Sequence, residues 1–112
     1  MKGTFIGEFE ELVLLSIAIL DQNAYGVSVK EEIKRKTGRN PSIGALHSSF
    51  KRLEEKGFIK SHLGEETPER GGRRKLYYSI TVTGVKTLRH SRELRNAMWN
   101  EIPTLILDVK KS

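Results

Sequence analysis

The sequence predicts an α+β domain in which three helices precede a two-stranded hairpin and one more helix follows it. Apolar residues recur at helical spacing up to about residue 56, with turn-forming residues between three such segments. Two segments of alternating apolar and polar residues then lie on either side of a turn rich in glycine and arginine. This order is typical of a winged helix-turn-helix with an additional C-terminal helix.

The first two helices are expected to form the inner part of the domain. Residues 8–20 become almost wholly apolar after a first turn that contains three glutamates, a pattern typical of a helix buried on most sides. A second helix is expected from about Ala24 to Thr37, where apolar residues recur at four-residue intervals. Its last turn is basic, and Gly38 follows as a left-handed terminator.

The third helix is expected over roughly Ile43 to Lys56, with Ser42 as its N-cap and Gly57 as its C-terminal stop. One face of this helix carries the apolar residues Ile43, Leu46, Phe50 and Leu53. The opposite face is small and basic, which suits a helix that enters the major groove of DNA. The candidate DNA contacts of this helix are Ser42, Gly44, Ala45, His47, Ser48, Lys51 and Arg52.

The residue types of this set have chemical reasons to face DNA. The glycine and the alanine let the helix backbone approach closely, and helix N-termini attract phosphate. Ser48 and Ser49 are short hydrogen-bond donors, whereas Lys51 and Arg52 bind phosphates or purine edges. The alternative is an ordinary solvated helix face, but the surrounding motifs favour the DNA interpretation.

The hairpin is expected to consist of strands at Phe58–Leu63 and Leu76–Val82, with one ring of Tyr77 and Tyr78 facing the core. Its tip carries cations beside two glycines, and these candidate DNA contacts are Arg70, Arg73, Arg74 and Lys75. Arginines are favoured in narrow minor grooves. The alternative is that these cations pair with acids of the same tip, which are Glu65, Glu66 and Glu69.

A C-terminal helix is expected from Gly84 to Glu101, capped by Thr83 and stopped near Pro103. Its apolar residues would expose a large surface on a small monomer, so we expect this helix to pair two subunits. The predicted dimer interface consists of Leu88, Leu94, Met98, Trp99 and Ile102. This prediction divides the chain into a DNA-binding domain, residues 1–83, and a dimerisation segment, residues 84–112. The tail from Thr104 is compatible with a further helical turn or with a frayed end.

Composition restricts the remaining functions. A net charge of +6 and a pI of about 9.7 favour a polyanionic partner such as duplex DNA. The chain has no cysteine and its three histidines are far apart in sequence, so neither a disulfide nor a metal site is expected. Catalytic and phosphate-binding motifs are absent, so we expect neither an enzyme nor a cofactor. The N-terminus has no long apolar segment, which predicts a cytoplasmic protein without a membrane anchor.

Five motifs along residues 7–84 resemble those of the PadR-like transcriptional regulators. The motifs are Gly7-Glu8-Phe9-Glu10, Ala24-Tyr25-Gly26, Ser42-Ile43-Gly44-Ala45-Leu46, Arg52-Leu53-Glu54-Glu55-Lys56-Gly57 and Gly71-Gly72-Arg73-Arg74-Lys75-Leu76-Tyr77-Tyr78-Ser79-Ile80-Thr81. The resemblance implies a winged helix-turn-helix that binds operator DNA as a homodimer, usually as a repressor, and dimerises through its C-terminal part. This chain has room only for the short form with one such helix. It departs from the family at His47, where tyrosine is usual.

Two alternatives concern the C-terminal helix. Some members of the resembling family bind aromatic compounds at the dimer interface, which makes Met98 and Trp99 candidate effector-binding residues. In that case they would line a slot together with apolar residues of the first helix, where flat aromatic ligands stack. The simpler alternative is that Trp99 is a packing residue. A rival function for the whole chain is a winged-helix protein-interaction module, for which Trp99 and the apolar tail would form the binding surface.

Overall fold

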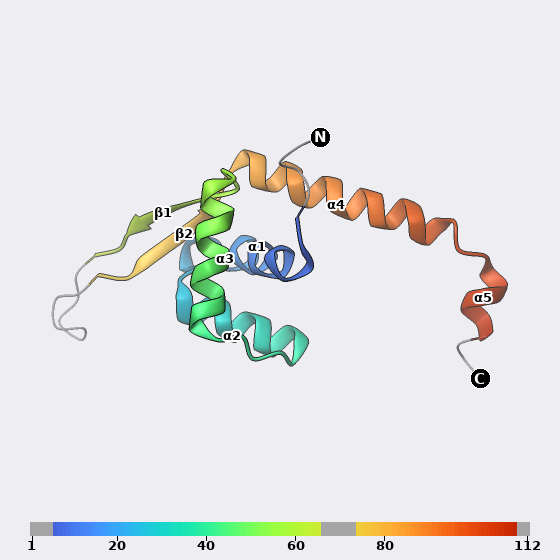
Figure 1. The fold of residues 1–112 in the computed structure, drawn as a ribbon, viewed down its shortest axis with the longest axis horizontal. Coiled ribbons are helices and arrows are strands. Elements are labelled where there is room, and N and C mark those ends of the chain that lie inside the picture. The colour runs from blue at the N-terminus through green and yellow to red at the C-terminus, as the bar shows by residue number, and fades with distance from the viewer. Residues whose placement is uncertain (1–5, 66–73, 110–112) are drawn as a thin grey trace.

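A helical body, a two-stranded hairpin and a C-terminal arm of two helices follow one another along the chain (Figure 1). The computed structural model describes residues 6–65 and 74–109. Its elements are α1 (Glu8–Leu20), the short 3-10 helix η1 (Asp21–Asn23), α2 (Gly26–Thr37), α3 (Ile43–Glu55), β1 (Ile59–Leu63), β2 (Leu76–Ile80), α4 (Val82–Asn100) and α5 (Thr104–Val109). The arrangement of α1, α2, α3 and the hairpin is that of a winged helix-turn-helix, which confirms the predicted fold class.

The core lies between the three body helices and the hairpin. Its buried apolar residues come from each of these elements and include Val13, Leu14, Ile17, Val29, Ile33, Leu46, Phe50, Leu53, Phe58, Ile59 and Tyr78. The rings of Phe50 and Tyr78 stack with their centroids 4.2 Å apart, so Tyr78 is the tyrosine that faces the core. Ile43 was predicted on the inner face of α3 but is exposed, because it lies in the first turn, at the end of the helix.

The hairpin gains a short additional pairing at the entrance to α2. The amide of Tyr78 donates to the Ala24 carbonyl at 2.8 Å, and Tyr25 forms an isolated antiparallel bridge with Tyr77. The prediction that α2 begins near Ala24 was therefore wrong: the helix begins at Gly26, after Tyr25 in extended conformation as its N-cap. Pairing with β2 satisfies backbone groups of this segment that a helix would otherwise use.

The start of α4 was also predicted two residues too late. Thr81, and not Thr83, caps the helix, and its Oγ accepts a hydrogen bond from the Gly84 amide at 3.0 Å. Val82, predicted to end the second strand, is the first residue of α4. The strand ends at Ile80 because Thr81 caps the helix that begins at Val82. The Thr81 amide and hydroxyl also donate to the carbonyls of Phe58 and Gly57, in the turn after α3.

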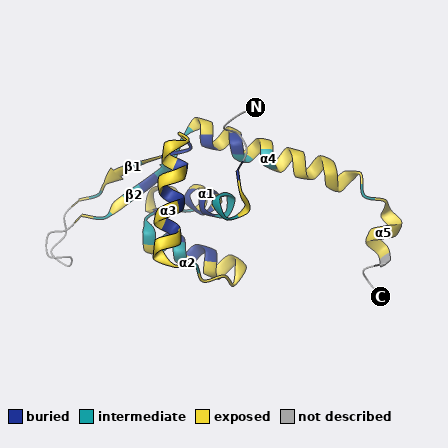
Figure 2. Ribbon diagram, viewed as in Figure 1, coloured by how far each residue is buried: buried dark blue, intermediate teal, exposed yellow. Residues whose placement is uncertain are grey.

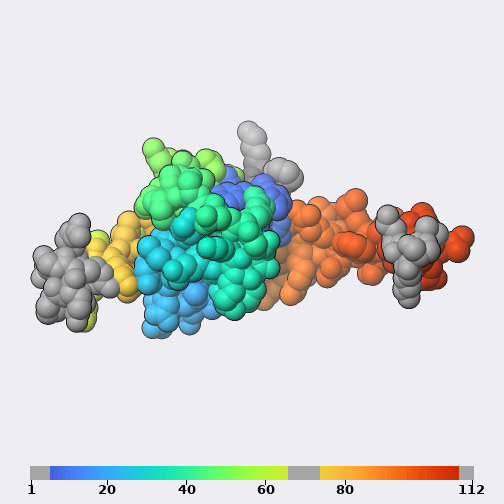
Figure 3. All heavy atoms as spheres, turned by 90° about the horizontal axis from the view of Figure 1, so that it is seen from below, coloured from blue at the N-terminus to red at the C-terminus, as the bar shows by residue number. Residues whose placement is uncertain are grey.

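The arm extends away from the body and gives the molecule its elongated shape, with extents of 60, 35 and 21 Å (Figure 3). Residues of the body are buried on their inner faces, whereas most of α4 and the described part of α5 are exposed (Figure 2). The tail that the sequence left open forms α5. One side of α1 is also uncovered: Leu15 is 40% exposed, although the sequence predicted a helix buried on most sides.

Candidate nucleic-acid interface

The outer face of α3 presents most of the predicted DNA contacts to solvent. Gly44, Ala45, His47, Ser48 and Lys51 are all exposed. A β-carbon added at Gly44 would meet no atom within 4 Å, so packing inside the chain does not require glycine there. This freedom is consistent with a helix surface that a large partner approaches closely.

Three serines near this face have different surroundings. The Oγ of Ser42 accepts a hydrogen bond from the Ala45 amide at 3.0 Å, which confirms Ser42 as the N-cap of α3. Ser48 is exposed, but Ser49 is fully buried. Ser49 was predicted as a donor to DNA, and this was wrong, because its position on the helix turns it toward the core.

Arg52 is held by the protein itself. Its guanidinium forms an ion pair with Glu10 of α1 at 2.5 Å, and the Lys56 ammonium contacts the other carboxylate oxygen of Glu10 at 3.0 Å. Burial of Glu10 raises its pKa, but hydrogen bonds from Arg52 and Lys56 outweigh burial and hold the pKa below its ordinary value. The attraction is therefore complete at neutral pH and weakens only as acid protonates Glu10. Among ion pairs between described residues, Arg52 is the one predicted DNA contact on α3 whose charge is compensated.

On the hairpin, the two predicted DNA contacts that the structure describes differ in their surroundings. Arg74 is exposed, whereas Lys75 is partly buried with its ammonium 3.8 Å from the centroid of the Tyr25 ring. This cation–π contact joins the tip end of β2 to the segment that precedes α2. Arg70 and Arg73, together with Glu66 and Glu69, lie outside the described residues.

One cation beside α3 was missed by the sequence analysis. Arg39 lies in the turn before α3, stacks over the Phe9 ring at 5.5 Å and donates to both carboxylate oxygens of Glu8 at 3.0 and 2.8 Å. It lines a hollow of about 300 Å³ together with Ala45 of the predicted DNA face. The basic run that ends α2 and continues to Arg39 was the available signal, but only the fold shows that this run ends at the N-terminus of α3.

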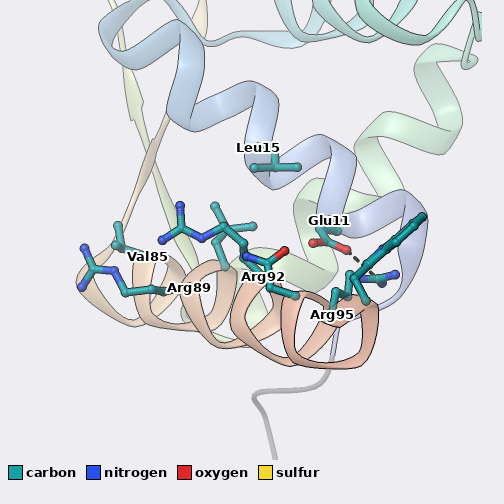
Figure 4. A pocket seen from close by; sticks show the side chains of 9 residues that line it. Glu11, Leu15, Val85, Arg89, Arg92 and Arg95 are labelled. Atoms are coloured by element: carbon teal, nitrogen blue, oxygen red, sulfur yellow. Dashed lines mark hydrogen bonds and ion pairs between the residues drawn. The ribbon is translucent and has the colours of Figure 1, made fainter. Parts of the chain in front are cut away.

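A larger groove lies between α1 and α4 (Figure 4). It has a volume of about 530 Å³ and is lined by Glu11, Leu15, Val85, Leu88, Arg89, Arg92, Arg95, Asn96 and Trp99. Trp99 is 61% exposed within one chain, so a packing role for this residue would require the surface of a second subunit. Met98 is exposed but does not line the groove, because successive residues of a helix point about 100° apart.

The predicted dimer residues divide into two groups. Leu94 and Met98 are exposed together with Trp99, whereas Leu88 is partly buried against the core of its own chain. Ile102 is partly buried after the end of α4. Leu88 therefore contributes at least in part to the packing of its own chain, since the first turns of α4 pack on the body.

Metal ligation and membrane insertion find no support in the described residues. Among them, no three side chains of histidine, aspartate or glutamate are grouped so that they would hold a metal ion. None of the helices in the described ranges has the length and apolar character needed to span a membrane.

Comparison with known families identifies the chain. The family model of the PadR-like transcriptional regulators matches residues 14–90. The chain belongs to this family. A PadR-like chain is a DNA-binding transcriptional regulator, and the family is in general not one of enzymes.

Solved structures agree with this assignment. A transcriptional regulator from Clostridium thermocellum is 32% identical over 80% of this chain and 83% of its own, with a TM-score of 0.65. A PadR family regulator from Clostridium difficile is 22% identical over 84% and 93% of the two chains, with a TM-score of 0.67. A PadR-like regulator from Bacillus cereus is 18% identical over 93% and 92%, also at 0.67. A search of curated proteins found no match.

Proposed function

We propose that this PadR-like regulator is a homodimeric repressor that binds a pseudo-palindromic operator. In this proposal α3 enters the major groove and the hairpin lies along the adjacent backbone or minor groove. The observation that carries it is the exposed small and basic face of α3, with Gly44, Ser48 and Lys51 beside one another and no internal packing role for Gly44. The exposed Arg74 of the hairpin supports the same orientation.

The homodimer is supported by the arm. Leu94, Met98 and Trp99 are 56, 64 and 61% exposed, an apolar surface that a second copy would bury by two-fold symmetry. Two copies of α3 would then contact two half-sites about one helical turn apart, or a multiple of it. In this proposal residues 84–112 form the dimerisation segment, although Gly84 and Thr87 are buried against the body of their own chain.

Substitutions made separately in the hairpin and in α3 test the proposed mode of DNA binding. Replacing Arg73 and Arg74 with alanine is expected to weaken binding to every duplex, and to lower the slope of log affinity against log salt by roughly one unit per lost phosphate contact. Replacing Ser48 or Lys51 with alanine is expected to change the preference among operators instead, at a cost of about 1–3 kcal/mol per lost base contact. Fluorescence anisotropy across a salt series measures both effects. Wild-type affinity and slope in the arginine double variant would exclude the hairpin from the interface.

An effector site is the second part of the proposal. The groove between α1 and α4 has apolar walls at Leu15 and Trp99, and it would lie next to a dimer interface formed by α4. Flat aromatic compounds would stack on Trp99 there. Met98 does not line the groove and is therefore not part of this proposed site.

Fluorescence of the single tryptophan tests the effector site. Titration with planar aromatic compounds is expected to change Trp99 emission saturably, and the same compounds are expected to change operator affinity. If the compound changes operator affinity by a given factor, operator DNA must change the affinity for the compound by the same factor, because the coupling is reciprocal. Emission that never saturates, or that saturates without any change in operator affinity, would return Trp99 to a purely packing role in the dimer.

A further inference from the structure

Helix α1 connects the DNA-facing helix α3 with the arm helix α4. Within the described residues α1 packs against both of these helices, whereas α3 and α4 have few contacts with each other. A change in the direction of α4 therefore reaches α3 through α1 or through the turn that follows α3. The contacts on these two routes determine how firmly the arm is attached to the body.

The first attachment lies at the beginning of α4. The Thr81 amide donates to the Phe58 carbonyl at 2.9 Å, and the Thr81 hydroxyl donates to the Gly57 carbonyl at 2.6 Å. Gly84 is buried directly against Phe58. Together with the burial of Thr87 and the packing of Leu88 on the core, this attachment fixes the first two turns of α4. The direction of the remaining turns depends on contacts farther along the helix.

The second attachment lies farther along α4. The Glu11 carboxylate of α1 accepts a hydrogen bond from the Ser91 hydroxyl at 3.1 Å. It also accepts one from the Arg95 guanidinium at 3.2 Å (Figure 4). Ser91 and Arg95 follow Gly84 by about 10 and 16 Å along the helix axis. The Glu11 side chain is only 16% exposed, whereas the Arg95 side chain is 58% exposed, so the contact is protected from solvent on the Glu11 side only. Two attachments this far apart determine the direction of α4.

The neighbouring residue of α1 holds α3 in the same way. Glu10 contacts Arg52 and Lys56 of α3, and its side chain is 12% exposed. Adjacent residues of a helix point about 100° apart, so Glu10 and Glu11 face different helices from one turn of α1. The first turn of α1 thus links the helix that faces DNA to the helix of the arm.

The geometry points to Glu11 as a positioning residue for operator recognition, which acts through Ser91 and Arg95 to hold α4 at one angle to the body. This inference rests on the proposed homodimer, in which α4 determines the separation of the two α3 helices. A rotation of α4 by about 10° would move the far end of this helix of about 28 Å by about 5 Å, more than one base-pair step of 3.4 Å. Glu11 therefore selects the half-site spacing that the dimer tolerates.

The test compares operators that differ only in half-site spacing. Selection from a random duplex library with the wild-type protein defines the half-site, and a series of duplexes then varies the separation one base pair at a time. Wild-type protein is expected to bind best at one spacing. Glu11→Ala is expected to reduce the preference for that spacing over its neighbours by about five- to tenfold, which is within the range of an ordinary net hydrogen-bond contribution. Affinity for a duplex with one half-site is expected to stay within about twofold, since α3 is unchanged.

Rescue separates positioning from a general loss of stability. Glu11→Arg and Arg95→Glu are each expected to broaden the spacing profile, and the double variant is expected to restore it, because the ion pair is re-formed in reverse. Glu8→Ala is the matched control for spacing: it removes a glutamate from the same turn, but Glu8 pairs with Arg39 of the body, so its loss alters at most the overall affinity for DNA. This variant is expected to keep the wild-type profile.

The inference and the proposed function fail in different ways. A monomeric wild-type protein, or one without any preferred spacing, would overturn both. A dimeric wild-type protein with a sharp preference that folded Glu11→Ala fully retains would overturn the positioning role of Glu11 alone. A broadened profile that the reversed pair does not restore would also overturn it, since the effect would then not arise from the Glu11–Arg95 contact.

Discussion

Replacing both Leu94 and Met98 with glutamate is expected to convert the dimer into monomers and to lower operator affinity by about 10²- to 10⁴-fold. The two side chains are 56 and 64% exposed on α4, so the substitutions remove little buried surface inside one chain. In the proposed dimer they would place four carboxylates in a buried apolar surface, which is costly without partners. Monomers then lose the gain in affinity that comes from binding two half-sites at once. Light scattering measures the mass, and anisotropy with a two-half-site duplex measures the affinity.

Val82→Glu is the matched control for this prediction. Val82 is 72% exposed on the same helix, but it lies in the first turn, about 18 Å or more from Leu94 along the axis. This variant is expected to remain a dimer with wild-type affinity. A Leu94 and Met98 double variant that remains dimeric at micromolar concentration would show that the subunits pair through another surface.

Gly84→Ala is expected to destabilise the protein by about 2–4 kcal/mol, which is near the upper end for overpacking substitutions. The added β-carbon would lie 2.3 Å from the Phe58 carbonyl oxygen and 2.7 Å from a side-chain carbon of Ile80. Relief of this overlap requires movement of the backbone, because the nearer of the two atoms, the Phe58 carbonyl oxygen, belongs to the backbone. Thermal unfolding followed by circular dichroism is expected to show a midpoint lower by roughly 10–20 °C for a domain of this size.

Gly44→Ala provides the contrast. Gly44 also lies within a helix, but an added β-carbon there meets no atom within 4 Å, so alanine is expected to raise stability by up to about 1 kcal/mol. In the proposed complex Gly44 faces DNA, so the same variant is expected to bind operator more weakly despite its higher stability. A Gly84→Ala protein as stable as wild type would contradict the tight packing of α4 on the turn after α3.

The sequence by itself determined the order and type of the elements. Apolar spacing predicted three body helices, the alternation in the hairpin predicted two strands, and Ser42 and Gly38 marked the start of α3 and the end of α2. These features are local: a cap, a terminator or an alternating strand is decided by residues within a few positions of one another. The same local signals failed at Ala24 and at Thr83, where pairing with distant segments took precedence.

Contacts between distant residues were decided only by the tertiary structure. Glu10 lies 42 residues before Arg52, and Glu11 lies 84 residues before Arg95, yet both pairs form in the fold. The sequence showed these glutamates only as acids at the start of a helix, where any partner is equally compatible with the helix dipole. The packing of α1 between α3 and α4 selects the partners, removes Arg52 from the free cations of the DNA-facing helix and creates the groove beside Trp99. The spacing of residues in a sequence predicts which side chains share one face of a helix or strand. Only tertiary packing determines which other element that face contacts.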